Sequence, residues 1–444
     1  MKIPPVKGTR DFYPPDMAVR NFIIDGWKKV SLRNGFEEYD GPIFEYLKMF
    51  QIKSGDEIAE QLFSLKDRGG RELALRPEIT PTLARMVNQQ ISSLPRPIKW
   101  FSVPRLFRAE RPQRGRLREF FQWNIDIIGV EDVLADAEVI FTTIDYLRSV
   151  GLTKKDVRVK ISSRKLLAEF LKKIGVNEKR FEPLYLLLDK YSKIPKETFE
   201  KLLEEQVPDV DLISKICSFM ETRKVSDIKA VVPDTDYVRD ALDEIVLLFD
   251  NLDRMNVGKF CEFDASIIRG LAYYTGIVFE VLDAKGDLRA ICGGGRFDNL
   301  LSDFGGPEIP ATGMGMGDCV LEVLLRQKDL LPDGLDSKQL DYFIAYVPVI
   351  TFDNKDGTVR TTPEDEAVAL TANLRSKGFS TEFTYKGIGL AKQLKEASDK
   401  NAKKCIIIGE EFNAGKLVVK DMATGKQDLI DLDKFLAQVK SKSK

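Results

Sequence analysis

Histidine is absent from this chain of 444 residues. The absence excludes an imidazole base, an imidazole nucleophile and any histidine ligand to a metal, so Ser–His triads and histidine-ligated zinc sites are ruled out. If the protein catalyses a proton transfer, the task falls to carboxylates, lysine, tyrosine or the substrate itself.

Long apolar runs and paired cysteines are missing as well. No stretch approaches the length of a membrane span, and the first residues, MKIPPVKGTRDFYPPDM, lack the apolar segment of a secretion signal. The five cysteines are scattered without a CxxC pair, which indicates reduced thiols and argues against a zinc knuckle. We expect a cytoplasmic protein that is not membrane-bound and holds no metal through its own side chains.

Charge and composition set broad limits on the fold. The net charge is −1, so any nucleic-acid binding requires a local basic patch. With 43% hydrophobic and 31% charged residues, the composition is that of an ordinary globular protein, and 444 residues suffice for two or three domains.

Strand-like and helix-like segments alternate irregularly up to residue 325. VRVKI (157–161) and KWFSV (99–103) alternate with period two, and IIRGLAYYTGIVFEV (267–281) followed by LRAICGGG predicts a long strand, a turn and a second strand. The segment from about 164 to 258 is amphipathic-helical. These patterns predict an α+β fold, an antiparallel sheet flanked by helices and interrupted by a helical insertion.

A second domain is predicted after a polar linker at 326–338, which carries Pro and Gly. Strands and helices then alternate from 339 to 444, with helices expected at 363–377 and 390–400. This alternation is typical of a small α/β domain with a mostly parallel sheet.

The segment RLFRAERPQRGRLREFFQWNIDIIG (105–129) is rich in arginine. Its centre, RPQRGR, is turn-forming and its flanks are strand-like, so the arginines are expected on a hairpin and at its tip. Arginine suits bidentate phosphate contact, although a merely solvated charged hairpin is the alternative. Gln122 and Asp126 share one side of the second strand, where a buried polar pair needs partners.

Other polar groups interrupt apolar segments. Glu78 precedes a helix expected to begin at about Thr80, where it either faces a cationic ligand group or is only an acidic first turn. Arg269 lies in an apolar segment, where burying a guanidinium is costly without a negative partner. Tyr273 and Tyr274 beside it would form a slot with a polar tip, suited to a flat ring.

Glycines recur in CGGGRFDNLL (292–301) and ATGMGMGDCVLEVLL (311–325). Gly313, Gly315 and Gly317 fall on one face of a strand that runs into a helix. A bare face of this kind is either a floor for a flat ligand or a place of close sheet–helix packing. Neither GxGxxG nor a P-loop is present, so Rossmann and Walker nucleotide binding are not supported.

Together these motifs resemble one family over almost the whole chain: histidyl-tRNA synthetase, of class II. The resemblance is carried by KGTRDFYPPD, LRPEIT, FRAERPQRGRLREFFQ, RGLAYYTGIVFE, CGGGRFD and GMGMGDCV. It implies a class II catalytic domain over 1–325, a linker over 326–338 and an anticodon-binding domain over 339–444. The implied activity is that of an aminoacyl-tRNA ligase, which activates histidine with ATP and transfers it to tRNA(His).

The resemblance also implies how ATP is held, with Mg²⁺ on its phosphates. Arg108 would clamp the α-phosphate, Glu110 would lie near the adenine amino group, and Arg116 would reach the β- and γ-phosphates. Arg269 would act at the α-phosphate in place of a metal, so the implied catalytic residues are Arg269, Arg108 and Arg116. Val320 stands where motif 3 usually carries an arginine, and Arg296 is the predicted substitute at the ATP.

The implied histidine-binding residues surround the substrate's amino group and ring. They are Glu78, Thr80, Gln122, Asp126, Arg269, Tyr273 and Tyr274. Arg111 and Gln113 would read the acceptor end of tRNA. The segment GPIFEYLKMFQIKSGDE (41–57) matches the region that forms the dimer interface of class II enzymes, which predicts a homodimer.

Two other functions stay open at this stage. One is an inactive, synthetase-like regulatory subunit of ATP phosphoribosyltransferase, which binds histidine as an effector. The other is a tRNA-binding module with a dead active site. Arg108, Arg116, Arg269 and the C-terminal domain all favour the active ligase.

Overall fold

The computed structural model describes residues 3–52, 62–207, 209–270, 273–335, 339–348, 352–353 and 360–439. The chain divides into two compact units, Met1–Pro332 and Asp333–Lys444. The division falls inside the polar segment 326–338. Within the described ranges, no helix is both long enough and apolar enough to cross a membrane.

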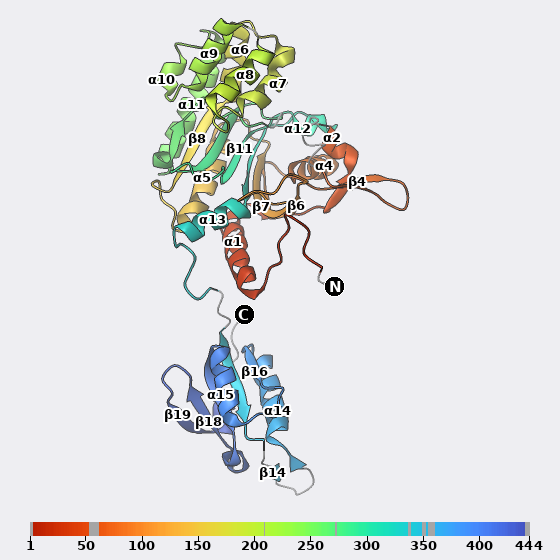
Figure 1. Ribbon diagram of the computed structural model, residues 1–444, viewed down its shortest axis with the longest axis vertical. Coiled ribbons are helices and arrows are strands. Elements are labelled where there is room, and N and C mark those ends of the chain that lie inside the picture. Colours follow the sequence, from red (N-terminus) through yellow and green to blue (C-terminus); the bar gives the residue numbers. More distant parts are fainter. Residues whose placement is uncertain are drawn as a thin grey trace. The chain divides into compact units, whose positions relative to one another are not determined.

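The first unit is built around one large sheet (Figure 1). Among the described residues, nine strands join it in the spatial order β1, β5, β7, β12, β11, β10, β8, β9, with β6 paired to β7. The bounds are β1 Glu37–Glu38, β5 Ile98–Ser102, β6 Arg105–Phe107, β7 Glu119–Ile128, β8 Val157–Ser163, β9 Cys261–Phe263, β10 Ile277–Asp283, β11 Cys292–Arg296 and β12 Ala311–Gly317. Neighbours run antiparallel except β1 with β5 and β8 with β9. The predicted antiparallel sheet with flanking helices is confirmed.

The two faces of this sheet differ because successive side chains of a strand point to opposite sides. Trp123 of β7 is fully buried and packs against Trp27 of α1 (Pro14–Arg33) and Tyr146 of α5 (Leu134–Ser149), with ring centroids 6.2 and 5.5 Å away. Its indole N–H donates to Ser31 Oγ at 2.8 Å. The opposite face of β7 carries the polar side chains, and the site forms there.

Helices gather at one end of the first unit, where α6 to α10 lie together (Figure 1). Helix α6 starts directly after β8, with the Ser163 hydroxyl accepting from the Leu166 N–H as a cap. The helices are α6 Arg164–Lys173, α7 Phe181–Leu188, α8 Lys196–Gln206, α9 Val210–Met220, α10 Val225–Ile228 and α11 Asp236–Arg254.

Segment 267–281 is not one long strand, and that prediction was wrong. Strand β10 begins only at Ile277, and Arg269 lies in the preceding loop with a backbone φ of +63°. A strand requires extended backbone with negative φ, so Arg269 cannot belong to one. The hairpin itself is confirmed, since β10 and β11 pair antiparallel with Glu280 opposite Gly293.

The arginine-rich segment forms the predicted hairpin. Strands β6 and β7 pair antiparallel, and at the tip Gln113 and Arg116 exchange two backbone hydrogen bonds of 2.9 Å. Gly115 turns the chain there with a φ of +74°, which a residue with a side chain rarely adopts. Helix α4 (Thr80–Gln90) begins where the sequence predicts.

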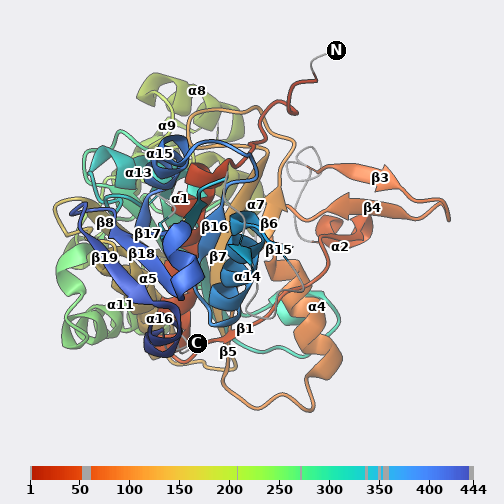
Figure 2. The same ribbon diagram turned by 90° about the horizontal axis from the view of Figure 1, so that it is seen from below.

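A small sheet stands apart from the large one. Strands β2 (Phe44–Tyr46), β4 (Glu72–Leu75) and β3 (Ser64–Lys66) form it, next to α2 (Leu47–Gln51). In Figures 1 and 2 the β3–β4 hairpin projects from the body of the first unit.

The second unit is α/β, but its sheet is mixed, not mostly parallel. Its described strands are ordered β16, β13, β17, β18, β19. The central strand β13 (Leu340–Tyr346) is parallel to β16 (Thr381–Phe383) and β17 (Ala402–Ile408), whereas β18 (Lys416–Asp421) and β19 (Gln427–Asp431) continue antiparallel. The antiparallel pair is joined by a tight turn, which needs no crossover helix. Helices α14 (Pro363–Ser376) and α15 (Leu390–Asp399) match the predicted positions.

Candidate active site

A cleft of about 1300 Å³ opens on the polar face of the large sheet. Its floor comes from β7, β10, β11 and β12, and its walls come from the β6–β7 hairpin, the loop before β10 and helix α7. The lining includes these residues predicted from the sequence: Glu78, Arg108, Glu110, Arg116, Gln122, Arg269 and Tyr273.

Gly293, Gly315 and Gly317 line the cleft, and Gly313 lies beside them on β12. A Cβ at Gly313 would come within 2.1 Å of Asp126 Oδ1, and one at Gly315 within 2.9 Å of the Gln122 amide. At Gly293 it would come within 2.5 Å of Arg269 Nη1. The close neighbours of these three glycines belong to β7, to β10 and to the loop before β10, not to a helix, so the structure does not support close sheet–helix packing.

Asp126 is the most perturbed acid at the site. It is 3% exposed on β7, and its Oδ2 has no hydrogen-bond partner among the described residues. Burial alone raises its pKa from 3.8 to about 8. A buried carboxyl with an unused oxygen is suited to pair with an N–H group of a ligand.

Glu78 stands before α4 and faces Tyr273. The Tyr273 hydroxyl donates to Glu78 Oε2 at 3.3 Å. Burial raises the pKa of Glu78, while the nearby Arg108 guanidinium opposes the rise. The structure thus brings a carboxylate, a phenol and an arginine from three distant segments to one place.

Arg108 is held by the chain around it. Its Nε donates to the Pro77 carbonyl at 3.1 Å, and its guanidinium lies 5.1 Å from the centroid of the Phe120 ring. Burial lowers the pKa of Arg108 and Glu78 counteracts the shift. A weakly solvated guanidinium in a fixed orientation is a strong partner for phosphate.

The two tyrosines are both nearly buried, at 9% and 8% exposure. Their ring centroids are 4.9 Å apart, and Phe297 meets Tyr273 edge-on at 5.8 Å. Tyr274 and Asp126 do not line the cleft itself; both are buried beside it. The two tyrosine rings and Phe297 thus form one aromatic cluster, which reaches the cleft through Tyr273.

Arg269 finds within the protein the negative partner that a guanidinium in an apolar segment needs. Its Nη1 lies 2.6 Å from Glu280 Oε1 on β10, and the Glu280 side chain is 9% exposed. Burial by itself would lower the pKa of Arg269, but Glu280 outweighs it and raises the pKa above its ordinary value. The internal ion pair explains how this guanidinium is tolerated.

The arginines of the hairpin divide between scaffold and cleft. Arg105 pairs with Glu119 at 2.6 Å, and Arg118 donates to the Glu110 carbonyl at 3.0 Å, so both stabilise the hairpin. Arg116 forms an ion pair with Glu110 inside the cleft. Two of the four residues predicted to bind ATP are therefore partners of each other.

Arg296 and Thr80 also stay outside the cleft. Arg296 points to the other face of the sheet, where Asp136 of α5 pairs with it and the Val130 carbonyl accepts from it at 3.0 Å. Its place as a substitute at the ATP is wrong, because alternation along β11 sends it away from Gly293. Thr80 opens α4 and is not among the lining residues.

The predicted acceptor-reading residues lie at the hairpin tip, and both are exposed. Gln113 accepts a hydrogen bond from Arg289 Nη2 at 2.5 Å.

Family comparisons agree with this geometry. A family model described as histidyl-tRNA synthetase matches residues 8–317, and one described as anticodon binding domain matches residues 347–442. This chain belongs to the histidyl-tRNA synthetase family. The match covers the sheet, the hairpin and the loop of Arg269, and the predicted recognition is confirmed.

The similarity to other members of the histidyl-tRNA synthetase family extends over nearly the full chain. Histidine–tRNA ligase, chloroplastic/mitochondrial, of Arabidopsis thaliana is 40% identical over 429 residues, covering 96% of this chain and 85% of that protein. Histidine–tRNA ligase of Opitutus terrae is 36% identical over 438 residues, covering 98% and 97%. The crystal structure of histidyl-tRNA synthetase from Nostoc sp. PCC 7120 superposes with a TM-score of 0.76 at 21% identity, covering 99% of each chain, which shows the shared fold.

The histidyl-tRNA synthetase match ends at Gly317, directly before Asp318 and Val320. Asp318 is buried at the start of α13 (Asp318–Gln327), where it pairs with Arg10 at 2.5 Å and accepts the Phe121 N–H at 3.0 Å. Val320 packs below the hairpin tip, since a Cβ on Gly115 would lie 3.0 Å from it.

Sequence reasoning missed two residues here, Glu280 and Arg10. Glu280 is a lone acid in the apolar run GIVFEV, the same signal that pointed to Arg269. Arg10 stood in a quoted motif, but nothing in the sequence indicated its partner Asp318, which lies 308 residues away.

Proposed function

We propose that this chain activates L-histidine with ATP to histidyl-adenylate and pyrophosphate, and then transfers the histidyl group to the 3′ end of tRNA(His). The observation that carries the proposal is the convergence of Glu78, Tyr273, Arg108 and Arg269 at one cleft. Asp126 is buried near Tyr273, beside this group. Acids and phenols suit an amino group and an imidazole, and the arginines suit a carboxylate and a phosphate.

In this proposal the histidine lies across the glycine floor. Glu78 receives the α-ammonium group, and Asp126 and Tyr274 meet the nitrogens of the ring. Because the polar groups below the floor are buried, an analogue that lacks a ring nitrogen leaves one of them unpaired. Sites of this kind reject such analogues by about 10⁴-fold, which makes a separate editing site unnecessary.

Arg108 and Arg269 act on the α-phosphate as the histidine carboxylate attacks it. Negative charge grows on the phosphate oxygens in the five-coordinate transition state, so preorganised guanidinium groups stabilise that state more than the ground state. Arg116 reaches the β- and γ-phosphates once it leaves Glu110, which then becomes free for the adenine amino group.

Mg²⁺ enters with the nucleotide in this account. Across the part of the chain that the structure describes, no group of three or more Cys, Asp or Glu side chains is placed to hold a metal ion. The donors that suit Mg²⁺ are then the phosphate oxygens of ATP, where it neutralises charge on the leaving pyrophosphate.

The transfer step needs a base for the ribose hydroxyl, and the chain has no imidazole. We propose that an oxygen of the adenylate phosphate or a water takes the proton. The exposed hairpin tip with Arg111 and Gln113 would contact the acceptor end of the tRNA. The second unit would contact the anticodon through exposed lysines, whose ammonium groups suit phosphate: Lys386, Lys392, Lys395, Lys403 and Lys404.

Aminoacylation of tRNA(His) is the direct test of this function. Purified protein with ATP, Mg²⁺ and each amino acid in turn is expected to charge tRNA(His) with histidine alone. Charging with another amino acid, or charging that does not need ATP, contradicts the proposal. A cytoplasmic location is proposed with it, in keeping with five cysteines that are all free thiols.

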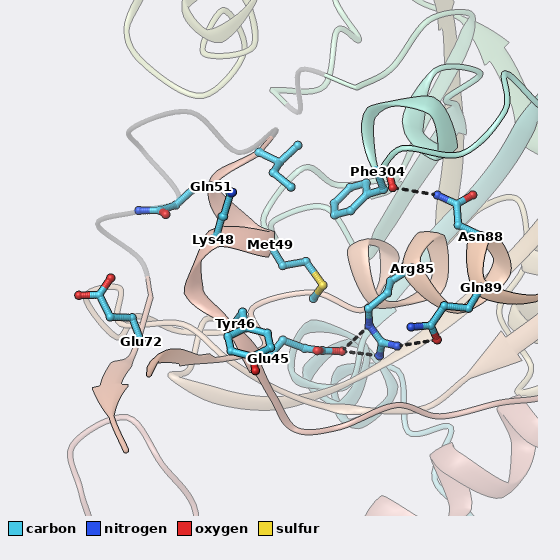
Figure 3. Close-up of a pocket in the computed structure, with 11 residues that line it drawn as sticks. Glu45, Tyr46, Lys48, Met49, Gln51, Glu72, Arg85, Asn88, Gln89 and Phe304 are labelled. Carbon is cyan, nitrogen blue, oxygen red and sulfur yellow. Dashed lines mark hydrogen bonds and ion pairs between the residues drawn. The ribbon is translucent and has the colours of Figure 1, made fainter. Parts of the chain in front are cut away.

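We further propose that the protein is a homodimer, joined through the small sheet and α2. Large apolar side chains are exposed there, each at 45–57%: Ile43, Phe44, Tyr46, Ile52 and Leu65. Next to them lies a cavity of about 650 Å³ with Met49 and Phe304 in its wall, and Glu45 pairs with Arg85 at 2.6 Å beside it (Figure 3). Contiguous apolar surface of this kind marks an interface. Residues 53–57 of the predicted interface segment lie outside the described residues.

The dimer proposal predicts a change of mass on substitution. Sedimentation of the wild type is expected to give twice the chain mass of 50.3 kDa. Tyr46→Glu places a charge in the interface and is expected to give the monomer, because burying an unpaired charge is costly. Tyr237→Glu is the matched control, since Tyr237 is 52% exposed on α11. A dimer that survives Tyr46→Glu and dissociates with Tyr237→Glu would place the interface elsewhere.

A further inference from the structure

The Arg269–Glu280 ion pair lies at the cleft, and the reaction described above uses Arg269 but gives Glu280 no role. Glu280 is on β10 with its side chain 9% exposed, and its Oε1 meets Arg269 Nη1 at 2.6 Å. It also lines the cleft. A carboxylate so close to a substrate-facing arginine competes for the same guanidinium that an anionic ligand needs.

Three features fix where this guanidinium lies. Arg269 stands in a loop with a left-handed backbone, which sets the direction in which its side chain leaves the chain. Glu280 and Gly293 are directly opposite each other in the sheet register. A Cβ at Gly293 would meet Arg269 Nη1 at 2.5 Å and Cζ at 2.7 Å, so the guanidinium rests on the bare backbone of β11.

The hydrogen bonds already made determine those left for a ligand. Nη1 is turned to Glu280, while Nε is buried and has no partner among the described residues. A guanidinium has five N–H groups in a rigid plane, so holding one nitrogen sets the direction of all the others.

We propose that Glu280 is a positioning residue for Arg269, which orients the guanidinium through Nη1 so that its remaining N–H groups point at the α-phosphate. The inference rests on the proposed function, because it assumes that Arg269 meets the nucleotide. Glu280 itself touches no reacting atom. Its hydrogen bond, more than its charge, sets the angle of the arginine.

The test first compares three single variants with the wild type in histidine-dependent exchange of pyrophosphate into ATP. Glu280→Ala is expected to lower kcat about 10- to 100-fold, since a misplacement of about 1 Å can cost that much, with the KM for ATP changed less than about threefold. Glu280→Gln keeps an acceptor oxygen and is expected to recover most of the rate. Glu244→Ala is the matched control, because Glu244 makes a 2.6 Å pair with Lys165 away from the cleft, and it is expected to match the wild type.

The decisive comparison is made in the Arg269→Ala background. If Glu280 acts through Arg269, adding Glu280→Ala to Arg269→Ala lowers the rate by less than about threefold. A full additional loss would overturn the proposal, as would equal losses in Glu280→Gln and Glu280→Ala. Wild-type exchange in the same experiment reports separately on the proposed function. Thermal unfolding of each variant identifies any loss that comes from misfolding, and Glu280→Gln keeps the size of the side chain for that reason.

Discussion

At the scale of single residues, Asp126 shows how the site is built at the expense of stability. Its pKa is raised to about 8 by burial, so the folded protein holds a proton that the unfolded chain releases above about pH 4. The stability that depends on this group is therefore full at low pH, falls as the pH rises towards 8, and changes little beyond it.

Asp126→Asn removes this dependence, since the amide does not ionise. We expect the variant to be more stable than the wild type by about 1–3 kcal/mol at pH 8, and the two to converge near pH 4. Tryptophan fluorescence during urea unfolding is a suitable measurement, because Trp27, Trp100 and Trp123 all lie in the first unit. The same variant should lose histidine-dependent exchange about 10- to 100-fold, because a neutral amide oxygen is a weaker acceptor for a ring N–H than a carboxylate oxygen. If the variant and the wild type differ equally in stability at every pH, Asp126 ionises normally and the account is contradicted.

The types of residue in the sequence predicted much of the site, but they did not predict which residues form ion pairs with one another. An arginine in an apolar segment pointed to a cation with an acidic partner, and Arg269 is partly buried and pairs with Glu280. Its partner Glu280 could not be assigned, because a local pattern does not say which of several distant acids comes within 3 Å. Arg296 shows the same limit: its glycine-rich context was correct, but the side of the strand on which it lies depends on the register of β11.

At the scale of elements, β12 is the strand whose glycines carry the most function. A methyl group at Gly313 would meet both Asp126 Oδ1 at 2.1 Å and the Ile125 carbonyl at 2.7 Å, whereas one at Gly317 would meet no atom within 4 Å. Gly313→Ala should therefore destabilise the first unit by about 1–3 kcal/mol and reduce histidine binding at least about tenfold. Gly317→Ala should leave the unfolding midpoint unchanged or slightly raised. Fluorescence-detected unfolding measures the stability of each variant, and calorimetry with histidine measures its affinity. Equal effects of the two substitutions would contradict the claim that the missing side chain at Gly313 is required.

Helices and strands were predicted well where the hydrophobic pattern within the segment itself determines the structure. Strand β8 and helices α4, α14 and α15 follow from alternation and from their starting residues. The loop that carries Arg269 was assigned to a strand because IIRGLAYYTG is apolar and aromatic, which is typical of strands. Its left-handed backbone is imposed by the packing of the loop, which the sequence pattern does not contain.

At the scale of the whole molecule, the two compact units predict a division of labour. A chain of residues 1–332 keeps the entire cleft and Leu330, which packs at Gly151. It should retain histidine-dependent exchange within about threefold, while charging of tRNA falls about 100-fold with the loss of a second binding module. Steady-state assays of both reactions measure the split. Loss of exchange in the truncated chain would mean that the second unit belongs to the site.

The most direct measurement of the central claim is histidine-dependent exchange of pyrophosphate into ATP, without tRNA, on the wild type and on Arg269→Ala. We predict exchange with histidine alone among the amino acids, and a loss of about 10²-fold or more in the variant. Absence of exchange in a wild-type protein that still binds histidine would contradict the account, and would indicate a regulatory histidine-binding subunit instead of a ligase.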